Sequence, residues 1–562
     1  MLWEKESRKE DALYLNMFAI SGGSATINEA LSGIRIETKD STWNKNDAVS
    51  MQRRTEGNEH FGNGYWNDAM EMYNASLRYA ESGSKNISLA YANRSACFLK
   101  MKRYNECLID VELAKEAGYP ADLMPKLDRR KEKCLKAIEE GAAEATIMKY
   151  EPILSFEPDE HFPCMANVVK IGRDAEGKVG LFAKEDVDVG QTIIKEKAFM
   201  AYVYSRYGWK CNVCLKEYGN FVSCSKCTVA MFCSEECRGN SLHDYECGLK
   251  FCETYRLNTE HGLTGGHAFE LNGLIMRVVR SCLVVIDMFA SVDELMNFVE
   301  QAIKSDRNQI PTTLSDVKLQ YGAFLKLPLK SNFTTLEDDA LCVVFEAHKM
   351  LLDIPKLKTI FNLKKYRRFL MHLISHHYLV LDVHSNIASS GFSRDSNVPW
   401  ASSTTGVMVG YLSHSCAPNV LVSTFHGNSV IITVRPVRKG QQIMNSLLLA
   451  LLTLPKDQRH KMLWLERRMI CQCVRCDGVT ASLAQCKRMR SDPVYQYLTS
   501  KQLNPDDDEA MQTMIDKCKT FLRKYGQLQW SDEIGNIAQV YVTLTYLQYR
   551  GLMSSETILE TS

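Results

Sequence analysis

The stretch that decides the fold reads Cys211-Asn-Val-Cys214, Cys224-Ser-Lys-Cys227, Cys233-Ser-Glu-Glu-Cys237, and then His243 and Cys247. Its seven cysteines and one histidine lie within 37 residues and supply two full tetrahedral ligand sets for Zn²⁺, which prefers thiolate and imidazole ligands. Paired ligands are three or four positions apart, so each pair fits on one tight turn or one helical turn. Bound ions would stabilise a segment too short and polar to form an apolar core. We therefore predict two zinc ions in residues 211–247; a disulfide cluster is the alternative.

Composition narrows the class of protein. The chain has 562 residues, enough for about three to four domains. Its 68 basic and 67 acidic residues give a net charge of +1. The composition therefore shows no excess of positive charge that would attract nucleic acid or an anionic membrane. Residues 1–10 lack the apolar core of a signal peptide, and the most apolar run, residues 446–454, is too short to span a bilayer. We expect a soluble, intracellular monomer without nucleic-acid or membrane contacts, whose 20 cysteines stay reduced. The sequence has no run of basic residues that would direct the protein to the nucleus, so we expect it in nucleus and cytoplasm.

A further group of cysteines lies in the C-terminal half. The motif Ser413-His414-Ser415-Cys416 is followed by Cys471-Gln-Cys473-Val-Arg-Cys476. The three thiolates of the second run need a fourth ligand, and Cys416 is the leading candidate. A third zinc ion on these four residues would tie position 416 to a segment 55 positions later. Four unrelated buried cysteines are the alternative.

Residues 51–140 carry a helical repeat pattern. Small and aromatic side chains recur every four positions from Gly57 to Leu77, and two further copies follow. The period of about 34 residues resembles tetratricopeptide repeats, of which three are about the least that bury a continuous face. Small residues such as Gly57 mark places where two helices approach closely.

Five residues of these repeats fall where some repeats of this kind clamp a C-terminal carboxylate: Arg54, Asn58, Asn93, Lys126 and Arg130. Cations and amides that line one groove would suit the acidic tail of a heat-shock chaperone. Solvated helix faces, with an asparagine joining neighbouring repeats, are the alternative.

The rest of the chain predicts an α+β fold. Residues 1–50 read as a leader, and residues 160–210 contain apolar strands separated by glycine turns. The segments 271–289, 292–303 and 366–381 carry apolar residues at helical spacing, and so do the C-terminal residues 481–562. On the helix from 509 to 525, one apolar face is expected to pack inward: Met511, Met514, Ile515, Cys518 and Leu522.

This order of segments resembles the SET and MYND domain family, and in particular its subgroup with tetratricopeptide repeats. The resemblance implies a SET domain in two parts, residues 160–210 and 401–446, split by a MYND finger at 211–247 and a helical insert at 248–400. A post-SET zinc site at 447–480 and the C-terminal helices follow. In the finger, the family pairs its ligands in an interleaved order. One ion would be held by Cys211, Cys214, Cys233 and Cys237, and the other by Cys224, Cys227, His243 and Cys247. The segment between Cys237 and His243 is two residues shorter than is usual in the family.

The resemblance also implies S-adenosylmethionine-dependent methylation of protein lysines, roles in transcription, and contacts to histone deacetylases. The cofactor residues carried over are Gly177, Lys178, Val179, Ser413, His414 and Met469. The family's Asn-His pair reads Ser413-His414 here, its two tyrosine positions hold Leu447 and Arg467, and an asparagine position holds His384.

These replacements predict a degenerate catalytic site with weak or absent cofactor binding. Leucine offers an amine no polar group, and arginine is a fixed cation that repels an ammonium. Each lost hydroxyl costs about 10²-fold or more, by analogy with the removal of one preorganised donor. Two hypotheses follow: a binding scaffold that keeps the fold and three zinc ions, or an active lysine methyltransferase in which another hydroxyl, such as that of Tyr411, substitutes.

Overall fold

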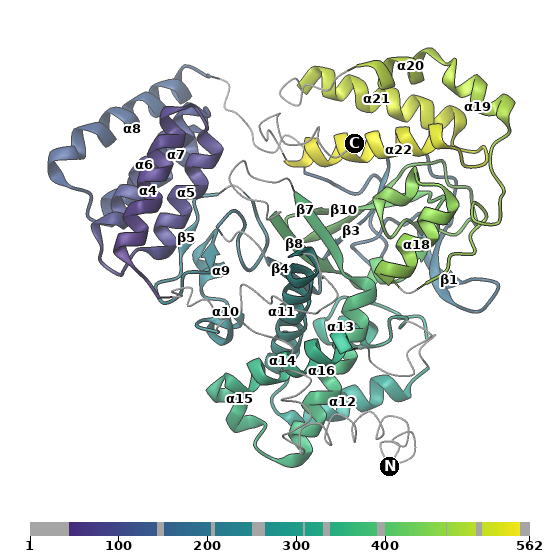
Figure 1. Ribbon diagram of the computed structural model, residues 1–562, viewed down its shortest axis with the longest axis horizontal. Helices are drawn as coiled ribbons and strands as arrows, with labels where there is room; N and C mark the ends of the chain where they lie inside the picture. Colours follow the sequence, from purple (N-terminus) through teal and green to yellow (C-terminus); the bar gives the residue numbers. More distant parts are fainter. Residues whose placement is uncertain are drawn as a thin grey trace. The chain divides into compact units, whose positions relative to one another are not determined.

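The N-terminal part of the chain is a row of antiparallel helices (Figure 1). In the computed structural model the described residues are 44–142, 151–203, 208–217, 219–249, 265–306, 309–329, 338–390, 400–467, 469–501 and 508–550. Most of the expected leader, residues 1–43, lies outside them. The chain divides into two units, one of Lys45–Asn240, Asn297–Pro328 and His384–Ser562, the other of Met1–Asn44, Ser241–Met296 and Leu329–Val383.

Five α-helices form the N-terminal array: α4 Asp47–Gly62, α5 Trp66–Tyr79, α6 Lys85–Lys100, α7 Tyr104–Glu116 and, after the 3₁₀ turn η1 Ala121–Leu123, α8 Met124–Glu139. Asn46 and Ser84 cap α4 and α6 by accepting backbone N–H groups of the first turn. A Cβ at Gly57 would lie 2.6 Å from the ring of Tyr73, so α4 and α5 pack closely only because this position is glycine. The predicted close approach at Gly57 is therefore observed.

Strands on both sides of the helical segment pair with one another. One sheet has the order β10-β11-β3, formed by β3 Thr192–Lys197, β10 Val420–Phe425 and β11 Asn428–Thr433, with Ile194 opposite Ile431. A second sheet joins β4 Met200–Val203, β8 Trp400–Thr405 and β7 Asn386–Ser390. Two smaller pairs are β1 Val169–Arg173 with β2 Val179–Ala183, and β9 Ser413–His414 parallel to β12 Met444–Asn445. These pairings bring residues 169–203 together with residues 400–445.

In the sequence, the finger and a group of helices follow residue 203. The finger contains β5 Val222–Ser223, β6 Met231–Phe232 and the short helices α9 Glu235–Arg238 and α10 Ser241–Glu246. The helices that follow are α11 Gly265–Asp287, α12 Val292–Lys304, α13 Val317–Leu325, α14 Asp338–Asp353, α15 Pro355–Ile360, α16 Lys364–His384 and α17 Val407–Gly410. The buried Ser281 Oγ on α11 lies 2.9 Å from His377 Nδ1 on α16. The three long helices predicted here are confirmed within a few residues.

The C-terminal part is helical: η2 Leu449–Leu452, α18 Lys456–Arg467, α19 Leu483–Arg490, α20 Pro493–Ser500, α21 Asp508–Tyr525 and α22 Asp532–Arg550. The predicted inward face of α21 is confirmed, since all five of its members are buried. They share a hydrophobic core with Leu421 of β10, Val430 of β11 and Trp530, so these helices cover one face of that sheet. Among the described residues, no helix has the length and apolar character that a membrane crossing requires.

Candidate metal centres and cofactor site

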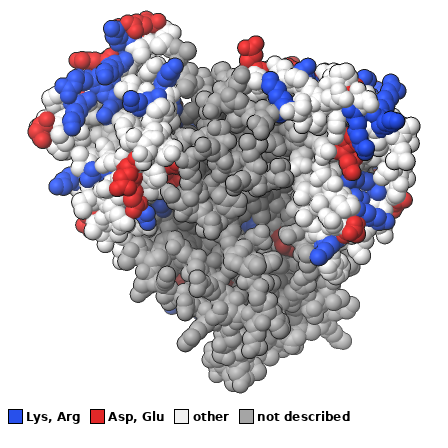
Figure 2. Space-filling model, turned by 45° about the horizontal axis from the view of Figure 1, so that its top comes forward, with Lys and Arg blue, Asp and Glu red and all other residues white. Residues whose placement is uncertain are grey.

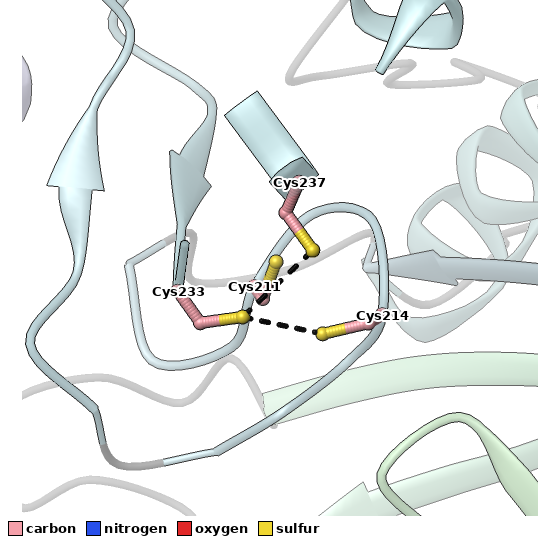
Figure 3. Close-up of side chains that lie close together, drawn as sticks. All are labelled: Cys211, Cys214, Cys233 and Cys237. Atoms are coloured by element: carbon pink, nitrogen blue, oxygen red, sulfur yellow. Dashed lines mark hydrogen bonds between the residues drawn. The ribbon is translucent and has the colours of Figure 1, made fainter. Parts of the chain in front are cut away.

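Four cysteines of the finger point toward one another (Figure 3). The Sγ atoms of Cys211, Cys214, Cys233 and Cys237 all lie within 4.8 Å of one another, and Cys233 Sγ is 3.4 Å from Cys214 Sγ and 3.8 Å from Cys237 Sγ. Four thiolates at the usual Zn–S bond length would be about 3.8 Å apart in a tetrahedron. The donor set and its spacing therefore fit a zinc ion.

Local structure explains how this set forms. Cys211 and Cys214 lie on a tight turn closed by the Leu215 N–H donating to the Cys211 carbonyl at 3.0 Å. Cys233 follows β6, and Cys237 lies on α9, where its N–H donates to the side chain of Ser234 at 3.2 Å. A tight turn thus presents Cys211 and Cys214, the end of β6 presents Cys233, and α9 presents Cys237.

The second set contains Cys224, Cys227, His243 and Cys247, whose ligand atoms also lie within 4.8 Å of one another. The Cys247 N–H donates to the His243 carbonyl at 2.7 Å, as expected for two ligands on one helical turn. The Lys226 N–H donates to Cys224 Sγ at 3.3 Å, a contact that favours a thiolate. The short segment between Cys237 and His243 does not prevent these four residues from meeting.

The third set joins Cys416 to Cys471, Cys473 and Cys476. Cys416 Sγ lies 3.7 Å from Cys476 Sγ, and the Cys416 N–H donates to Cys473 Sγ at 3.4 Å. Arg459 donates through Nη2 to Cys476 Sγ at 3.3 Å, which places a cation beside the thiolates. All the cysteines of the three sets are free thiols in the described part of the chain, so the disulfide alternative is not realised there.

The residues expected to contact S-adenosylmethionine occupy two places. Gly177 and Lys178 lie in the turn between β1 and β2, and Val179 begins β2. In this turn Asp174 Oδ1 accepts the Lys178 N–H at 2.9 Å and Gly177 has a φ of +80°. Ser413 and His414 form β9. A Cβ at Gly180 would lie 2.8 Å from Gln442 Nε2, so β2 approaches the residue that contacts Ser413.

The side chains of the Ser413-His414 pair already have partners. Gln442 Nε2 donates to Ser413 Oγ at 2.9 Å. His414 Nδ1 accepts the N–H of Leu447 at 3.2 Å, and its Nε2 lies 3.6 Å from Cys416 Sγ. Burial lowers the pKa of His414 to about 4, so the imidazole is neutral and Nδ1 is free to accept.

Leu447 and Arg467 occupy the two positions that hold tyrosines in the family. Leu447 is half-buried and packs against the cluster of Cys416, Leu451 and Leu463, as does Met469. Arg467 ends α18, and its side chain lies outside the described residues. A leucine in an apolar cluster offers neither a donor nor an acceptor to an amine.

Tyr411 and His384 are the two remaining residues that the sequence singled out for the catalytic site. Tyr411 is buried, and burial, with a contribution from the nearby Glu196 carboxyl, raises the pKa of its hydroxyl. His384 Nε2 lies 2.7 Å from the carbonyl oxygen of Pro328. Tyr411 therefore keeps a neutral hydroxyl at physiological pH.

The predicted clamp residues lie on α4, α6 and α8. Asn93 Nδ2 donates to Asn58 Oδ1 at 2.8 Å, and the Tyr73 hydroxyl donates to the same oxygen at 3.0 Å. Arg130 donates to the Ala92 carbonyl and to Ser95 Oγ. Arg54 Nε is buried without a hydrogen-bond partner among the described residues, while Lys126 is exposed. Figure 2 shows Lys and Arg side chains on this helical part, interspersed with Asp and Glu.

Sequence reasoning missed one group of buried charges beside the first metal set. Arg94 and Asp110, on α6 and α7, are both fully buried. A charged residue on a helix normally indicates a solvated face, so only their position among apolar neighbours such as Tyr91, Phe98 and Val111 could have signalled burial.

Comparison with known proteins finds no matching family model. Three curated relatives share the description protein-lysine N-methyltransferase SMYD4. The Danio rerio protein is 25% identical over 231 residues, which cover 36% of this chain and 30% of the relative. The Mus musculus protein is 23% identical over 510 residues (71% and 63%), and the Homo sapiens protein 23% over 519 residues (71% and 63%). The chain thus spans less than two thirds of each relative, and its resemblance to SMYD4 within the SET and MYND domain family is confirmed.

Proposed function

We propose that this SMYD4-like chain is a three-zinc scaffold of the SET and MYND type, derived from lysine methyltransferases but with a degenerate catalytic site. In each of the three sets, four ligand atoms lie within 4.8 Å of one another, and this supports a count of three zinc ions. One observation carries the functional part: Leu447, at a tyrosine position of the family, packs in the apolar cluster behind the third metal set and donates its backbone N–H to His414.

Methyl transfer to lysine is an in-line attack of a neutral amine on a sulfonium methyl group, and the enzyme contributes chiefly position and exclusion of water. Hydroxyls that orient the amine supply part of this positioning. Leu447 supplies none, and the family residue at position 467 is replaced by a cation. The amine would therefore lack two of its directing contacts.

The residues present fit zinc better than they fit S-adenosylmethionine. Each metal set offers four soft or borderline ligands at tetrahedral spacing. In the cofactor region, Ser413 Oγ is engaged by Gln442 and His414 Nδ1 by Leu447, and serine lacks the combined donor and acceptor of an asparagine amide. The cofactor region therefore does not fit S-adenosylmethionine.

Titration calorimetry of the full chain with S-adenosylmethionine tests this proposal. We expect no measurable binding, and elemental analysis should give three zinc ions per chain. Transfer of labelled methyl groups to peptide arrays at a rate like that of active relatives would overturn the scaffold. Two or fewer zinc ions in well-folded protein would remove the third site.

The second candidate is an active methyltransferase with an altered site, and Tyr411 favours it. Its hydroxyl is buried next to the motif and stays neutral, as a group that orients an amine must. If methyl transfer is seen, a Tyr411→Phe variant tests whether Tyr411 orients the amine, because it removes that oxygen and nothing else.

As a scaffold, the protein would act through binding. We propose that the groove of α4, α6 and α8 takes the C-terminal carboxylate of an acidic peptide such as a chaperone tail, with Arg54, Lys126 and Arg130 as the cations and Asn58 and Asn93 as the amides. The half-buried Arg54 on α4 and the exposed Lys126 on α8 support an anion there. By analogy with the family, the finger would bind histone deacetylase-type partners in nucleus and cytoplasm, in the control of transcription.

A further inference from the structure

The N-terminal helices and the first metal set share one hydrophobic core. Cys211, Phe221 and Met231 of the finger are buried in the same cluster as Tyr73, Leu77, Tyr91 and Phe98 of the array. The other three ligands of the set, Cys214, Cys233 and Cys237, pack against this cluster as well. All four ligands of the first set therefore contact the core that holds the helices together.

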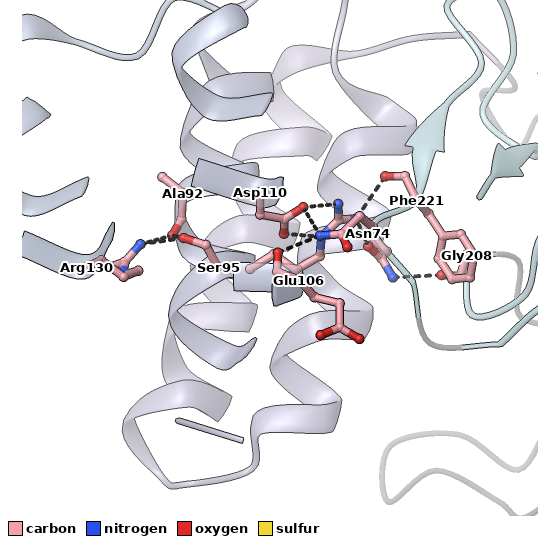
Figure 4. A network of polar contacts seen from close by, with 10 residues as sticks. Asn74, Ala92, Ser95, Glu106, Asp110, Arg130, Gly208 and Phe221 are labelled. Atoms are coloured by element: carbon pink, nitrogen blue, oxygen red, sulfur yellow. Dashed lines mark hydrogen bonds and ion pairs between the residues drawn. The ribbon is translucent and has the colours of Figure 1, made fainter. Parts of the chain in front are cut away.

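A buried ion pair reinforces this shared core (Figure 4). Arg94 on α6 donates to both carboxylate oxygens of Asp110 on α7, and its Nη1 also donates to the Phe221 carbonyl of the finger at 2.9 Å. Asn220 of the finger donates to Asp110 Oδ1 at 2.7 Å and to the Glu106 carbonyl at 2.8 Å. The charges of the pair are thus completed by two finger residues that directly precede β5.

Further contacts satisfy the backbone of both parts. Asn74 Nδ2 donates to the Gly208 carbonyl and Arg78 Nη1 to the Thr228 carbonyl, both at 2.8 Å. In the opposite direction, Ser223 Oγ donates to the Leu77 carbonyl at 2.9 Å. Because buried backbone groups must be paired, separating the finger from the helices would leave these groups to water or unsatisfied.

One turn of α6 connects this interface to the proposed clamp. Asn93 bonds Asn58, while the next residue, Arg94, bonds the Phe221 carbonyl on the finger. The same turn receives Arg130, which donates to Ala92 and Ser95. Any displacement of α6 at the finger side therefore moves Asn93 itself and the partners of Asn58 and Arg130.

We propose that the first metal site is the structural base of the peptide groove, so that zinc binding by Cys211, Cys214, Cys233 and Cys237 and capture of an acidic C-terminal peptide are coupled. The peptide part rests on the clamp proposed above. Metal binds the folded finger and not a disordered one, which stabilises the folded state by linkage. Since the helices share the core of that finger, they gain the same stabilisation, and loss of this ion loosens the groove without touching a clamp residue.

Hydrogen exchange of the full chain, read by mass spectrometry, tests the coupling. Cys237→Ser removes one ligand of the first set, and Cys473→Ser is the matched control in the third set. We expect Cys237→Ser to raise amide exchange in α5, α6 and α7 by about tenfold or more while α21 and α22 are unchanged. In Cys473→Ser, α5 to α7 should exchange as in the wild type. Unchanged protection of α5 to α7 in Cys237→Ser overturns the proposal.

A second variant tests the link without altering a ligand. Arg94→Met with Asp110→Leu removes both charges of the pair, and we expect retained zinc but at least tenfold weaker binding of a peptide ending in Glu-Glu-Val-Asp. Arg490→Met, which breaks an ion pair with Glu533 in the C-terminal helices, should leave peptide binding unchanged. Undiminished peptide binding by the double variant contradicts the coupling. If the wild type fails to bind the peptide, the clamp is wrong, and the exchange result still decides whether metal and helices are coupled.

Discussion

Arg94 and Asp110 form a fully buried ion pair with two hydrogen bonds of 2.7 Å, Nε to Oδ2 and Nη2 to Oδ1. The pair joins α6 to α7, and the remaining donors of Arg94 bond Asn74 and the Phe221 carbonyl. A buried pair is weak evidence for net stabilisation, but removal of one partner leaves an uncompensated charge.

Arg94→Met should therefore destabilise the protein by about 3–5 kcal/mol, measured by urea unfolding, because Asp110 stays buried without its cation. The control is Lys131→Met, which breaks the surface pair with Glu112, and both of those side chains are at least two-fifths exposed. That change should leave the stability nearly unchanged, because water screens an exposed pair. Equal effects of the two substitutions would show that the Arg94 pair is solvated in the folded protein.

Gly427 lies between β10 and β11 with a φ of +72°, and a Cβ there would lie 2.7 Å from the carbonyl oxygen of Cys214. Gly427→Ala should cost about 3 kcal/mol, since it combines backbone strain with a clash. Gly440, with a φ of +80° and nothing within 4 Å of its Cβ position, is the matched control for strain alone, at about 1 kcal/mol. Because Cys214 is a metal ligand, zinc release to a chelator should also be faster in Gly427→Ala and unchanged in Gly440→Ala.

Glu196 is buried, and its carboxylate accepts the N–H groups of Val407, Met408 and Val409. Burial raises the pKa of Glu196 to about 7, and the three N–H groups oppose that shift without cancelling it. The folded state thus holds the proton more tightly than the unfolded state, whose pKa is near 4.5. The contribution of this group to stability is complete below about pH 4.5 and is lost as the pH rises through about 7.

Glu196→Gln, which resembles the protonated form, should therefore gain stability relative to the wild type as the pH rises from about 5 to 8, by up to ~3 kcal/mol. Thermal unfolding at each pH measures this difference, in which the pH dependence of metal binding cancels. A difference for Glu196→Gln that does not change with pH would mean that this carboxyl is ionised throughout.

A peptide ending in Glu-Glu-Val-Asp should bind the helical groove at micromolar strength. Amidation of its C-terminal carboxylate should abolish binding, because the cations of the clamp bind that negative charge. Lys126→Ala should weaken binding, whereas Lys136→Ala, further along α8, should not. Titration calorimetry measures both. Equal affinity for the free and the amidated peptide would rule out the clamp and favour solvated faces, with Asn93 joining Asn58 of the neighbouring repeat.

The sequence predicted what depends on local spacing. Ligand pairs such as Cys211 and Cys214 lie on one turn, so their chemistry is visible in a few residues, and the inward face of α21 follows from helical periodicity. The bond from Arg94 to Phe221 joins residues 127 positions apart, and no local pattern encodes it. The bond between Gln442 and Ser413 was missed for the same reason, since it depends on how β2, β9 and β12 meet.

The last prediction concerns catalysis. The double change Leu447→Tyr with Arg467→Tyr restores both hydroxyls of the family, and each is expected to contribute about 10²-fold to methyl transfer. Leu447→Phe with Arg467→Phe is the control, because it restores the ring volume and removes the cation without adding a hydroxyl. Labelled methyl transfer to peptide arrays should be absent from the wild type and from the phenylalanine variant. It should be measurable in the tyrosine variant if Ser413 and His414 still admit the cofactor.

Because Gln442 engages Ser413, a tyrosine variant that stays inactive should be combined with Ser413→Asn, which restores the amide of the family pair. Activity of the wild type would contradict the scaffold, and activity that survives Tyr411→Phe would show that the Tyr411 hydroxyl is not the group that orients the amine.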